Sequence, residues 1–453
     1  MTTPLEAEVL ARITPTPLEA KEMQAVCDAL VAACAAALAK RNIPGHATVQ
    51  GSVAKGTWLA GGGDIDLFLL LDPSYPEAQL ERAAVEVGTE VLTDARRRYA
   101  QHPYLMGTFQ GRQVDLVPAY AVPVASAKMS AVDRTPFHTA WVRATLTPAQ
   151  QGEARLLKRW LKGTALYGAQ TAIGGFSGYL VEVLVARFRS FHGVLKWLAA
   201  DAQPRRIALG PDQVTDEVAV LVVVDPVDPG RNCAAAVQAE LLERAREAAT
   251  AYLERPDARF FFPAPPRAEP ADKLRPALAR QGAAWLGLVL RPRTDRLDLV
   301  FPQFQKAGRT LAAALEEAGF AVRRWEARAS PDEREALLQF VVDGRTLPAT
   351  RLHVGPVDDA RPHAERFRAK WTGHADAAGP VHAGPRGSLQ VEVRESLRTA
   401  TAWLPARLPK VPLGRHVEAC LPDAQVLLDP ADAPAAWAPA VADLVLDRRS
   451  WQR

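Results

Sequence analysis

The hydrophobic pattern in the N-terminal part of the chain predicts a unit with a sheet at its centre. Alanine, leucine and valine recur at helical spacing from about Leu18 to Arg41, and a short strand, HATVQ, follows. Residues Ile65–Leu71 are almost wholly apolar and predict a buried strand. A helix with a polar face is expected from Glu77 to about Ala100, followed by strands near Tyr104–Gln110 and Arg112–Pro118. This order of elements indicates an α/β or α+β fold.

The pattern becomes mainly helical beyond about Ala140. Helical spacing extends over Gly152–Lys162, Ser177–Phe188 and about Ser190–Ala200, and another helix is expected from about Cys233 to Glu254. A strand, VAVLVVVDPV, precedes that last helix. These segments predict a second, mainly helical domain.

The clearest change in composition lies at Phe260–Pro270, where eleven residues include four prolines. Beyond this segment the pattern runs strand, helix, strand, strand, helix, strand, which is the split βαβ or ferredoxin-like arrangement. We therefore expect a multidomain α+β protein with three parts, residues 1–140, 141–262 and 263–453.

Composition is ordinary for a globular protein of 453 residues, with 48% hydrophobic and 23% charged residues. The net charge of +4 permits a polyanionic partner without requiring one. The four cysteines form no CxxC pair and are expected to be buried thiols in a reducing compartment. The N-terminus has no apolar signal segment, and apolar stretches such as Val218–Val224 are far shorter than the ~20 residues of a membrane span. A cytoplasmic protein without a membrane partner is expected.

Candidate chemistry is concentrated in the segment QGSVAKGTWLAGGGDIDLFLLLDP. Asp64 and Asp66 share one face of the predicted strand, because side chains alternate along a strand, while Ile65 points into the core. Two adjacent anions repel unless a cation compensates them, and hard carboxylate oxygens suit Mg²⁺. Asp115, a lone acid in an apolar strand, is the expected third carboxylate of the site.

A DxD pair by itself is better explained as a strand end whose acids are solvated. Two further features favour a metal site here, the isolated Asp115 and the pair Gly51-Ser52. That pair begins a tight turn, where glycine permits close approach of the backbone, and exposed amides with a hydroxyl can hold phosphates.

The order GS, DxD and a distant strand Asp resembles the polymerase-β-type nucleotidyltransferase superfamily. Several segments between about Leu18 and Ala235 also resemble the class I (archaeal-type) CCA-adding tRNA nucleotidyltransferases, and HVGP, HAERFRAKW and SLQVEVRE keep that family's order further on. The segments are YAQHPYLMGTFQGRQVDLVPAY, AVDRTPFH, RLLKRWLK, YGAQTAIGGFSGYLVEVLV and VVDPVDPGRN. One departure is Asp64, which stands where members of the family often carry Glu.

The resemblance implies an enzyme that builds or repairs the 3′-terminal CCA of tRNA from CTP and ATP without a nucleic-acid template. It implies a polymerase-β-like catalytic palm in residues 1–140, a helical domain contacting the nucleotide in 141–262 and a tRNA-binding region in 263–453. Mg²⁺ is the implied cofactor, with Mn²⁺ as the alternative. A homodimer stays open.

The resemblance also implies roles for individual residues. Asp64 and Asp66 would hold the metals, and Asp115 would help to activate the terminal hydroxyl of the RNA. Nucleotide binding would involve residues of the turn and of the later motifs. Those assigned to phosphate are Gly51, Ser52, Lys55, Lys158, Lys162 and Tyr167. Those assigned to the nucleotide and its base are Thr135, His138, Arg231 and Asn232.

The residue types alone leave structural alternatives open for these positions. Lys158 and Lys162 are four apart on one helix and share a face, which could bind polyphosphate or be solvated. His138 could be a packed core histidine, Tyr167 a packed aromatic at a helix end and Arg231 a capping residue.

RNA binding is indicated only by scattered basic clusters, each of which could be a solvated surface. Trp325 and Trp371 lie beside such clusters and could stack on bases. The clusters are Arg96–Arg98, Arg155/Lys158/Arg159/Lys162, Arg291/Arg293/Arg296, Arg323/Arg324 and Arg366/Arg368/Lys370.

Three other functions compete with CCA addition. A different RNA 3′-end nucleotidyltransferase, such as a poly(A) polymerase, a partial CC- or A-adding enzyme or an RNA-repair enzyme, would use the same carboxylates. A tRNA-binding protein without catalysis would have no reason to keep three costly acids. A small-molecule nucleotidyltransferase would have no need of the long region beyond Pro270.

Overall fold

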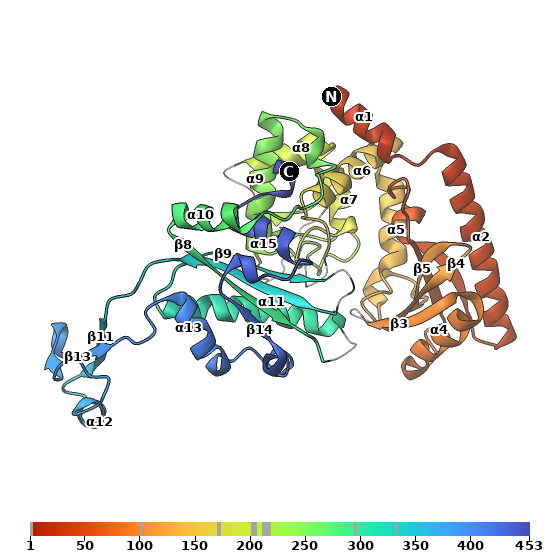
Figure 1. Ribbon diagram of the computed structural model, residues 1–453. Helices are drawn as coiled ribbons and strands as arrows, with labels where there is room; N and C mark the ends of the chain where they lie inside the picture. The colour runs from red at the N-terminus through yellow and green to blue at the C-terminus, as the bar shows by residue number, and fades with distance from the viewer. Residues whose placement is uncertain are drawn as a thin grey trace. The chain divides into compact units, whose positions relative to one another are not determined.

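The computed structural model describes residues 3–99, 103–169, 174–200, 206–210, 219–293, 297–330, 332 and 334–453. The chain forms two compact units (Figure 1). The first comprises Met1–Pro265 together with Arg449–Arg453, and the second comprises Pro266–Arg448.

The first unit contains a five-stranded sheet with the strand order β1-β2-β5-β4-β3. Strand β1 is antiparallel to β2, and β2 is parallel to β5. Helices α2 and α4 pack with the sheet in one hydrophobic core (Figure 1). The predicted buried strand Ile65–Leu71 is confirmed as β2. The elements are β1 (Gly45–Gln50), β2 (Ile65–Leu71), β3 (Thr93–Tyr99), β4 (Pro103–Phe109), β5 (Arg112–Tyr120), α2 (Pro17–Lys40), α3 (Gly51–Ala54) and α4 (Glu77–Val91).

The helix predicted from Glu77 to about Ala100 is wrong in its last part. Helix α4 ends at Val91, and β3 runs antiparallel to β4 along the edge of the sheet. Charged side chains are typical of exposed edge strands, where they oppose aggregation, so the sequence DARRRY carries no apolar alternation that would reveal a strand. Helix α1 (Pro4–Ile13) was not predicted, although Thr3 and Glu6, which form a capping box at its start, stand at the spacing typical of a helix N-terminus.

Helices α5 to α9 build the rest of the first unit around a core that includes Trp160, Phe191, Tyr252 and Phe261. The three predicted helices of this region are confirmed. The fourth begins at Ala239 rather than at Cys233, and the predicted strand is reduced to the two residues of β7, paired with β6. The elements are α5 (Thr135–Thr145), α6 (Pro148–Gly163), α7 (Gly178–Phe188), α8 (Phe191–Ala199), α9 (Ala239–Glu254), β6 (Arg206–Ile207) and β7 (Val222–Val223).

The second unit contains two separate sheets, β14-β8-β10-β9 and β11-β13-β12. The predicted strand, helix, strand, strand order is present as β8, α11, β9 and β10. The expected last strand, β13, lies in the other sheet, so the single split βαβ sheet is corrected to two. The elements are α10 (Ala271–Gln281), β8 (Ala283–Leu290), α11 (Leu297–Glu317), β9 (Val322–Ala329), β10 (Ala336–Asp343), β11 (Thr350–Val357), α12 (Arg361–Trp371), β12 (His382–Ala383), β13 (Ser388–Arg394), α13 (Ala400–Arg407), α14 (Arg415–Glu418), β14 (Gln425–Leu427) and α15 (Ala438–Val445).

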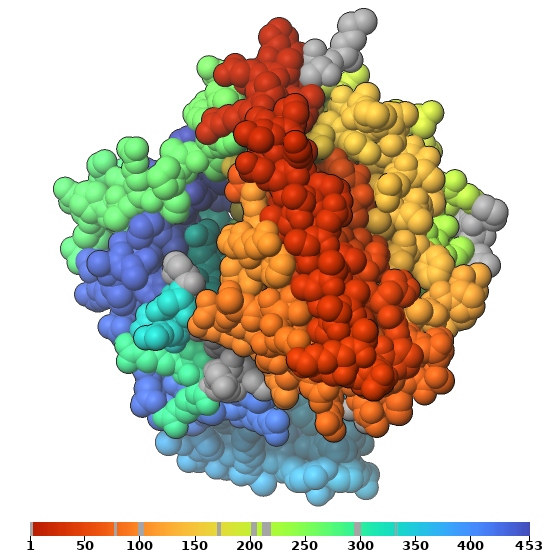
Figure 2. Space-filling view, turned by 90° about the vertical axis from the view of Figure 1, so that its right-hand side faces the viewer, coloured from red at the N-terminus to blue at the C-terminus, as the bar shows by residue number. Residues whose placement is uncertain are grey.

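The stretch Pro4–Lys40 is long and apolar enough, by length and composition, to cross a membrane. In the structure it forms α1 and α2, and one side of α2 is buried against the sheet through Met23, Cys27, Leu30 and Cys34. The other side lies on the surface, where both helices are drawn in red (Figure 2). This half-buried pattern is that of a core helix packed on a sheet.

Candidate active site

Strands β2 and β5 bring two of the three predicted carboxylates together. Asp66 and Asp115 are direct partners in the parallel pairing of these strands, and Asp64 lies just before β2. Asp64 is exposed and the other two are half-buried, whereas Ile65 between them is fully buried, as the alternation predicted. The acids therefore gather at the beginning of β2, on the side of the sheet away from the core.

Gly51 fits tightly against Asp66. It follows the last residue of β1, Gln50, which pairs with Asp66, and its φ of +66° lies in the left-handed region. A Cβ atom at this position would lie 1.8 Å from Asp66 Oδ2, so only glycine can occupy it without displacing the carboxylate. The predicted turn after Gly51-Ser52 is in fact the short helix α3, which begins with these two residues.

The electrostatic environment of Asp66 suits a cation. Burial raises its pKa, the neighbouring Asp64 raises it further, and Lys55 and Lys158 oppose the shift. Among the described residues, no three His, Cys, Asp or Glu side chains are arranged to hold a metal ion by themselves. Mg²⁺ commonly binds one or two carboxylates together with water and substrate phosphates, and the pair Asp64 and Asp66 fits that donor set.

A buried ion pair follows α3. The Nζ atom of Lys55 lies 2.8 Å from Oε2 of Glu182 on α7, and the Thr57 hydroxyl donates to Oε1 of the same carboxylate at 2.6 Å. Lys158 on α6 donates to the backbone oxygen of Thr57 at 3.0 Å, and burial lowers the pKa of Lys158 to about 8. Lys55 and Lys158, both predicted to bind phosphate, thus lie near the buried Glu182.

Tyr167 and Lys162 lie at the end of the same region. Lys162 is exposed, and its ammonium lies 5.2 Å from the centroid of the Tyr167 ring. Burial, together with the negative charges of Glu182 and Asp66, raises the pKa of Tyr167 to about 12. The phenol therefore keeps its proton at neutral pH and can act as a hydrogen-bond donor.

Asp225 connects the residues predicted to contact the base. Its carboxylate is fully buried and accepts from His138 Nε2 at 2.8 Å, Arg231 Nη1 at 3.0 Å and the Tyr179 hydroxyl at 3.0 Å. The Tyr179 ring stacks on His138, with centroids 3.9 Å apart, and its centroid also lies 5.0 Å from Lys55 Nζ. Tyr179 therefore contacts both Lys55 and His138.

The two remaining predicted residues differ in their surroundings. Thr135 is the half-buried first residue of α5. Asn232 is buried, its side-chain oxygen accepts from the backbone N–H groups of Val223 and Ala234, and its nitrogen donates to the backbone oxygen of Leu221. Asn232 thus holds the loop that carries Arg231.

Sequence reasoning missed Glu182, Asp225 and Tyr179. Glu182 is a lone acid in the apolar helix YLVEVLV, which is the same signal that singled out Asp115. Asp225 lies in the quoted segment VVDPVDPGRN but received no role. Arg155, grouped with a basic cluster, donates instead to the backbone oxygens of Gly56 and Trp58.

Comparison with known proteins identifies the family of this chain. The family model for a nucleotidyltransferase domain matches residues 34–138, and that for the second domain of tRNA nucleotidyltransferase matches residues 152–262. The model for the C-terminal domain of the CCA-adding enzyme matches residues 293–429. A CCA-adding enzyme of Halobacterium salinarum is 36% identical over 410 residues, 90% of each chain.

The chain belongs to the CCA-adding enzyme family. A second member, from Haloarcula marismortui, is 35% identical over 445 residues and 94% of each chain. The predicted resemblance is confirmed, as is the multidomain α+β fold with a nucleotidyltransferase domain. The solved structure of the Cid1 poly(U) polymerase is similar at 17% identity and a TM-score of 0.44, covering 56% of this chain and 94% of that one.

Proposed function

We propose that this CCA-adding enzyme family member builds or repairs the 3′-terminal CCA of tRNA from CTP and ATP, releasing pyrophosphate. The observation that carries this proposal is family membership over 90% of the chain, in which the nucleotidyltransferase domain holds Asp66 and Asp115 side by side. A partial CC- or A-adding enzyme, or another RNA 3′-end nucleotidyltransferase, is the alternative. In our proposal the protein acts in the cytoplasm, and a homodimer stays open.

The proposed catalytic residues are the three carboxylates. Asp64 and Asp66 would hold a divalent ion, Mg²⁺ or in its place Mn²⁺, which when bound supplies positive charge to phosphate oxygens. Asp115 would receive the proton of the terminal RNA hydroxyl, whose oxygen attacks the α-phosphorus of the nucleotide. The bond to pyrophosphate then breaks, which balances the new phosphodiester bond.

The triphosphate would lie along α3 and the buried lysines. Ser52 and the backbone at Gly51 would donate to phosphate oxygens, and Lys55 and Lys158 would supply positive charge. Tyr167, with its proton retained, would donate a further hydrogen bond beside the exposed Lys162. Glu182 would hold Lys55 in place, since it is the partner of that ammonium in the structure.

The nucleotide itself would contact α5 and the loop after β7. Thr135 and His138 lie on α5, and Arg231 is half-exposed beside Asp225. Asn232 would act by fixing this loop, because three backbone groups occupy its amide. In this proposal residues 1–140 catalyse, residues 141–262 bind the nucleotide and residues 263–453 bind tRNA.

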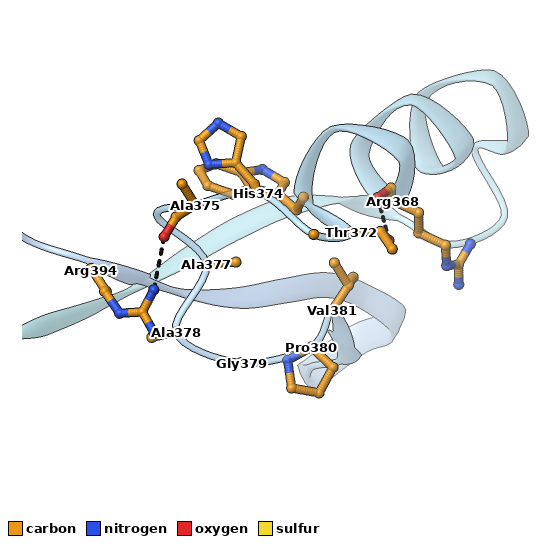
Figure 3. A pocket seen from close by; sticks show the side chains of 12 residues that line it. Arg368, Thr372, His374, Ala375, Ala377, Ala378, Gly379, Pro380, Val381 and Arg394 are labelled. Carbon is orange, nitrogen blue, oxygen red and sulfur yellow. Dashed lines mark hydrogen bonds between the residues drawn. The ribbon is translucent and has the colours of Figure 1, made fainter.

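The second unit contains a pocket of about 620 Å³ whose lining includes two arginines. It lies between the end of α12 and the loop before β12, and Arg368, His374 and Arg394 contribute to its lining (Figure 3). Arg394 donates to the Ala375 backbone oxygen, and Arg368 pairs with Asp358. Trp371, which could stack on bases, also lines this pocket, although most of its side chain is buried.

Primer extension tests the proposal directly. Purified protein and Mg²⁺ would be given tRNA transcripts that lack CCA, CA or only the final A, with each nucleotide alone and with CTP plus ATP. Addition of C, C and A followed by a halt is the expected result. A long A tail, or addition of one base only, would move the protein to the alternative. tRNA binding should also weaken steeply with salt, since phosphate contacts release counterions.

A further inference from the structure

Asp225 accepts hydrogen bonds from three side chains, although the proposed function gives it no role. Its Oδ2 accepts from His138 Nε2 and Arg231 Nη1, and its Oδ1 accepts from the Tyr179 hydroxyl and from the Val227 N–H at 2.9 Å. The donors come from α5, α7 and the loop after β7. One carboxylate therefore ties three segments of the chain together.

The charges in this cluster are well defined. Burial by itself would raise the pKa of Asp225, but the hydrogen bonds from His138 and the Val227 N–H, together with the positive charge of Arg231, hold it below its usual range. Burial is also the largest influence on His138 and lowers its pKa. At neutral pH the cluster thus contains an ionised Asp225, a charged Arg231 and a neutral imidazole.

An ionised carboxylate can only accept hydrogen bonds, so the proton of neutral His138 must lie on Nε2. The Nδ1 atom of the ring is then an acceptor. Arg231 has one guanidinium nitrogen bonded to Asp225, while the side chain is about one-third exposed. Asp225 thereby determines which polar atoms His138 and Arg231 can present to a ligand.

We propose that Asp225 is a positioning residue for nucleotide selection, which fixes the guanidinium of Arg231 and the tautomer of His138. This inference rests on the proposed function, in which these two residues contact the incoming nucleotide. Asp225 itself need not touch the nucleotide, because it is fully buried behind them.

Asp225→Asn tests the proposal with little change in shape. The amide would donate where the carboxylate accepts, so either His138 must change its tautomer or a hydrogen bond must break. We expect the KM for CTP and ATP to rise about tenfold or more, since a hydrogen bond to a charged group is lost, with a smaller change in kcat. Incorporation of UTP and GTP relative to CTP should increase.

Asp228→Asn is the matched control. Asp228 lies in the same loop, but its carboxylate binds Lys128 at 2.7 Å and Arg134 at 2.9 Å. We expect this variant to keep nucleotide KM values within about twofold of those of the wild type. An equal rise in both variants would overturn the proposal, because it would indicate a general disturbance of the loop.

A double-mutant cycle separates positioning from mere stability. Because the proposal has Asp225 act through both Arg231 and His138, Asp225→Asn should raise the KM by a smaller factor in an Arg231→Ala background than in the wild-type protein. Additive effects, or equal losses of kcat, tRNA binding and melting temperature in Asp225→Asn, would overturn it. Should Asp225→Asn fail to fold, Asp225→Glu, which keeps the charge but displaces the carboxylate from its donors, is put through the same cycle.

Failure of the proposed function gives a different result. In that case the wild-type protein would not extend tRNA with C, C and A, whatever happens at position 225. Equilibrium dialysis of CTP and ATP against the wild-type and variant proteins would still decide the role of Asp225. Weaker binding in Asp225→Asn but not in Asp228→Asn supports it, and equal binding in all three overturns it.

Discussion

The two groups of acids in the first unit differ in how their negative charge is balanced. At the β2–β5 site, burial and a second carboxylate raise the pKa of Asp66. At the second site, Asp225 is buried more completely, yet its pKa is lowered because three side chains and a backbone N–H donate to it. A carboxylate that has its donors within the protein organises its neighbours, whereas adjacent carboxylates retain an affinity for an added cation.

Removing an acid of the β2–β5 site should have the largest effect. Asp64→Ala or Asp115→Ala should lower nucleotide addition by about 10³-fold or more, because the charge that holds the metal or accepts the proton is lost. tRNA binding, measured by filter retention, should change little. Asp72→Ala is the control, since Asp72 is exposed at the other end of β2 and its side chain makes its described hydrogen bonds with Ser74. Loss of tRNA binding together with activity would mean that the acids are structural.

Gly51→Ala should be the next most severe change. The added Cβ would meet Asp66 Oδ2 at 1.8 Å and displace the carboxylate, and a displacement of about 1 Å can cost about 10²-fold in rate. Gly111→Ala is the matched control, because Gly111 has a similar φ of +75° but open space around its Cβ position. Equal activity of the two variants in primer extension would show that the close fit at Gly51 does not matter.

The low pKa of Lys158 predicts a dependence on pH. With a pKa of about 8, the ammonium is mostly charged at pH 7 and mostly neutral at pH 9, whereas an ordinary lysine stays charged to about pH 10. The KM for CTP should therefore rise by roughly threefold to tenfold between pH 7 and pH 9, as one charged contact is lost. Lys158→Gln should have a raised KM without that increase, and the same pH profile in both proteins would remove Lys158 from the triphosphate site.

The smallest expected effect belongs to the Asp225 cluster. Tyr179→Phe removes one of several donors to Asp225, so the free energy of unfolding in urea should fall by only about 1 kcal/mol. Tyr75→Phe is the control. The Tyr120 hydroxyl donates to the backbone oxygen of Tyr75, so this hydrogen bond should persist when the Tyr75 phenol is removed. A loss above about 3 kcal/mol would mean that the remaining donors do not compensate and that the cluster behaves as one unit.

Local patterns in the sequence predicted much of the fold and the three candidate carboxylates. The apolar run of β2, the alternation that exposes Asp66 beside buried Ile65, and the isolation of Asp115 can each be recognised within a few residues. The pairing of Asp66 with Asp115 follows once two apolar strands are placed in one sheet. Short charged segments gave no such signal, which is why β3 was predicted as part of a helix.

The family, the candidate carboxylates and the apolar elements could be predicted from the sequence, because they depend on residue types at short spacing. The partners of the polar groups became known from the three-dimensional structure. Lys55 meets Glu182 across 127 positions and His138 meets Asp225 across 87, and no local pattern encodes such pairs. The separation of the C-terminal strands into two sheets was likewise settled by long-range pairing, since strands with similar patterns can join either sheet.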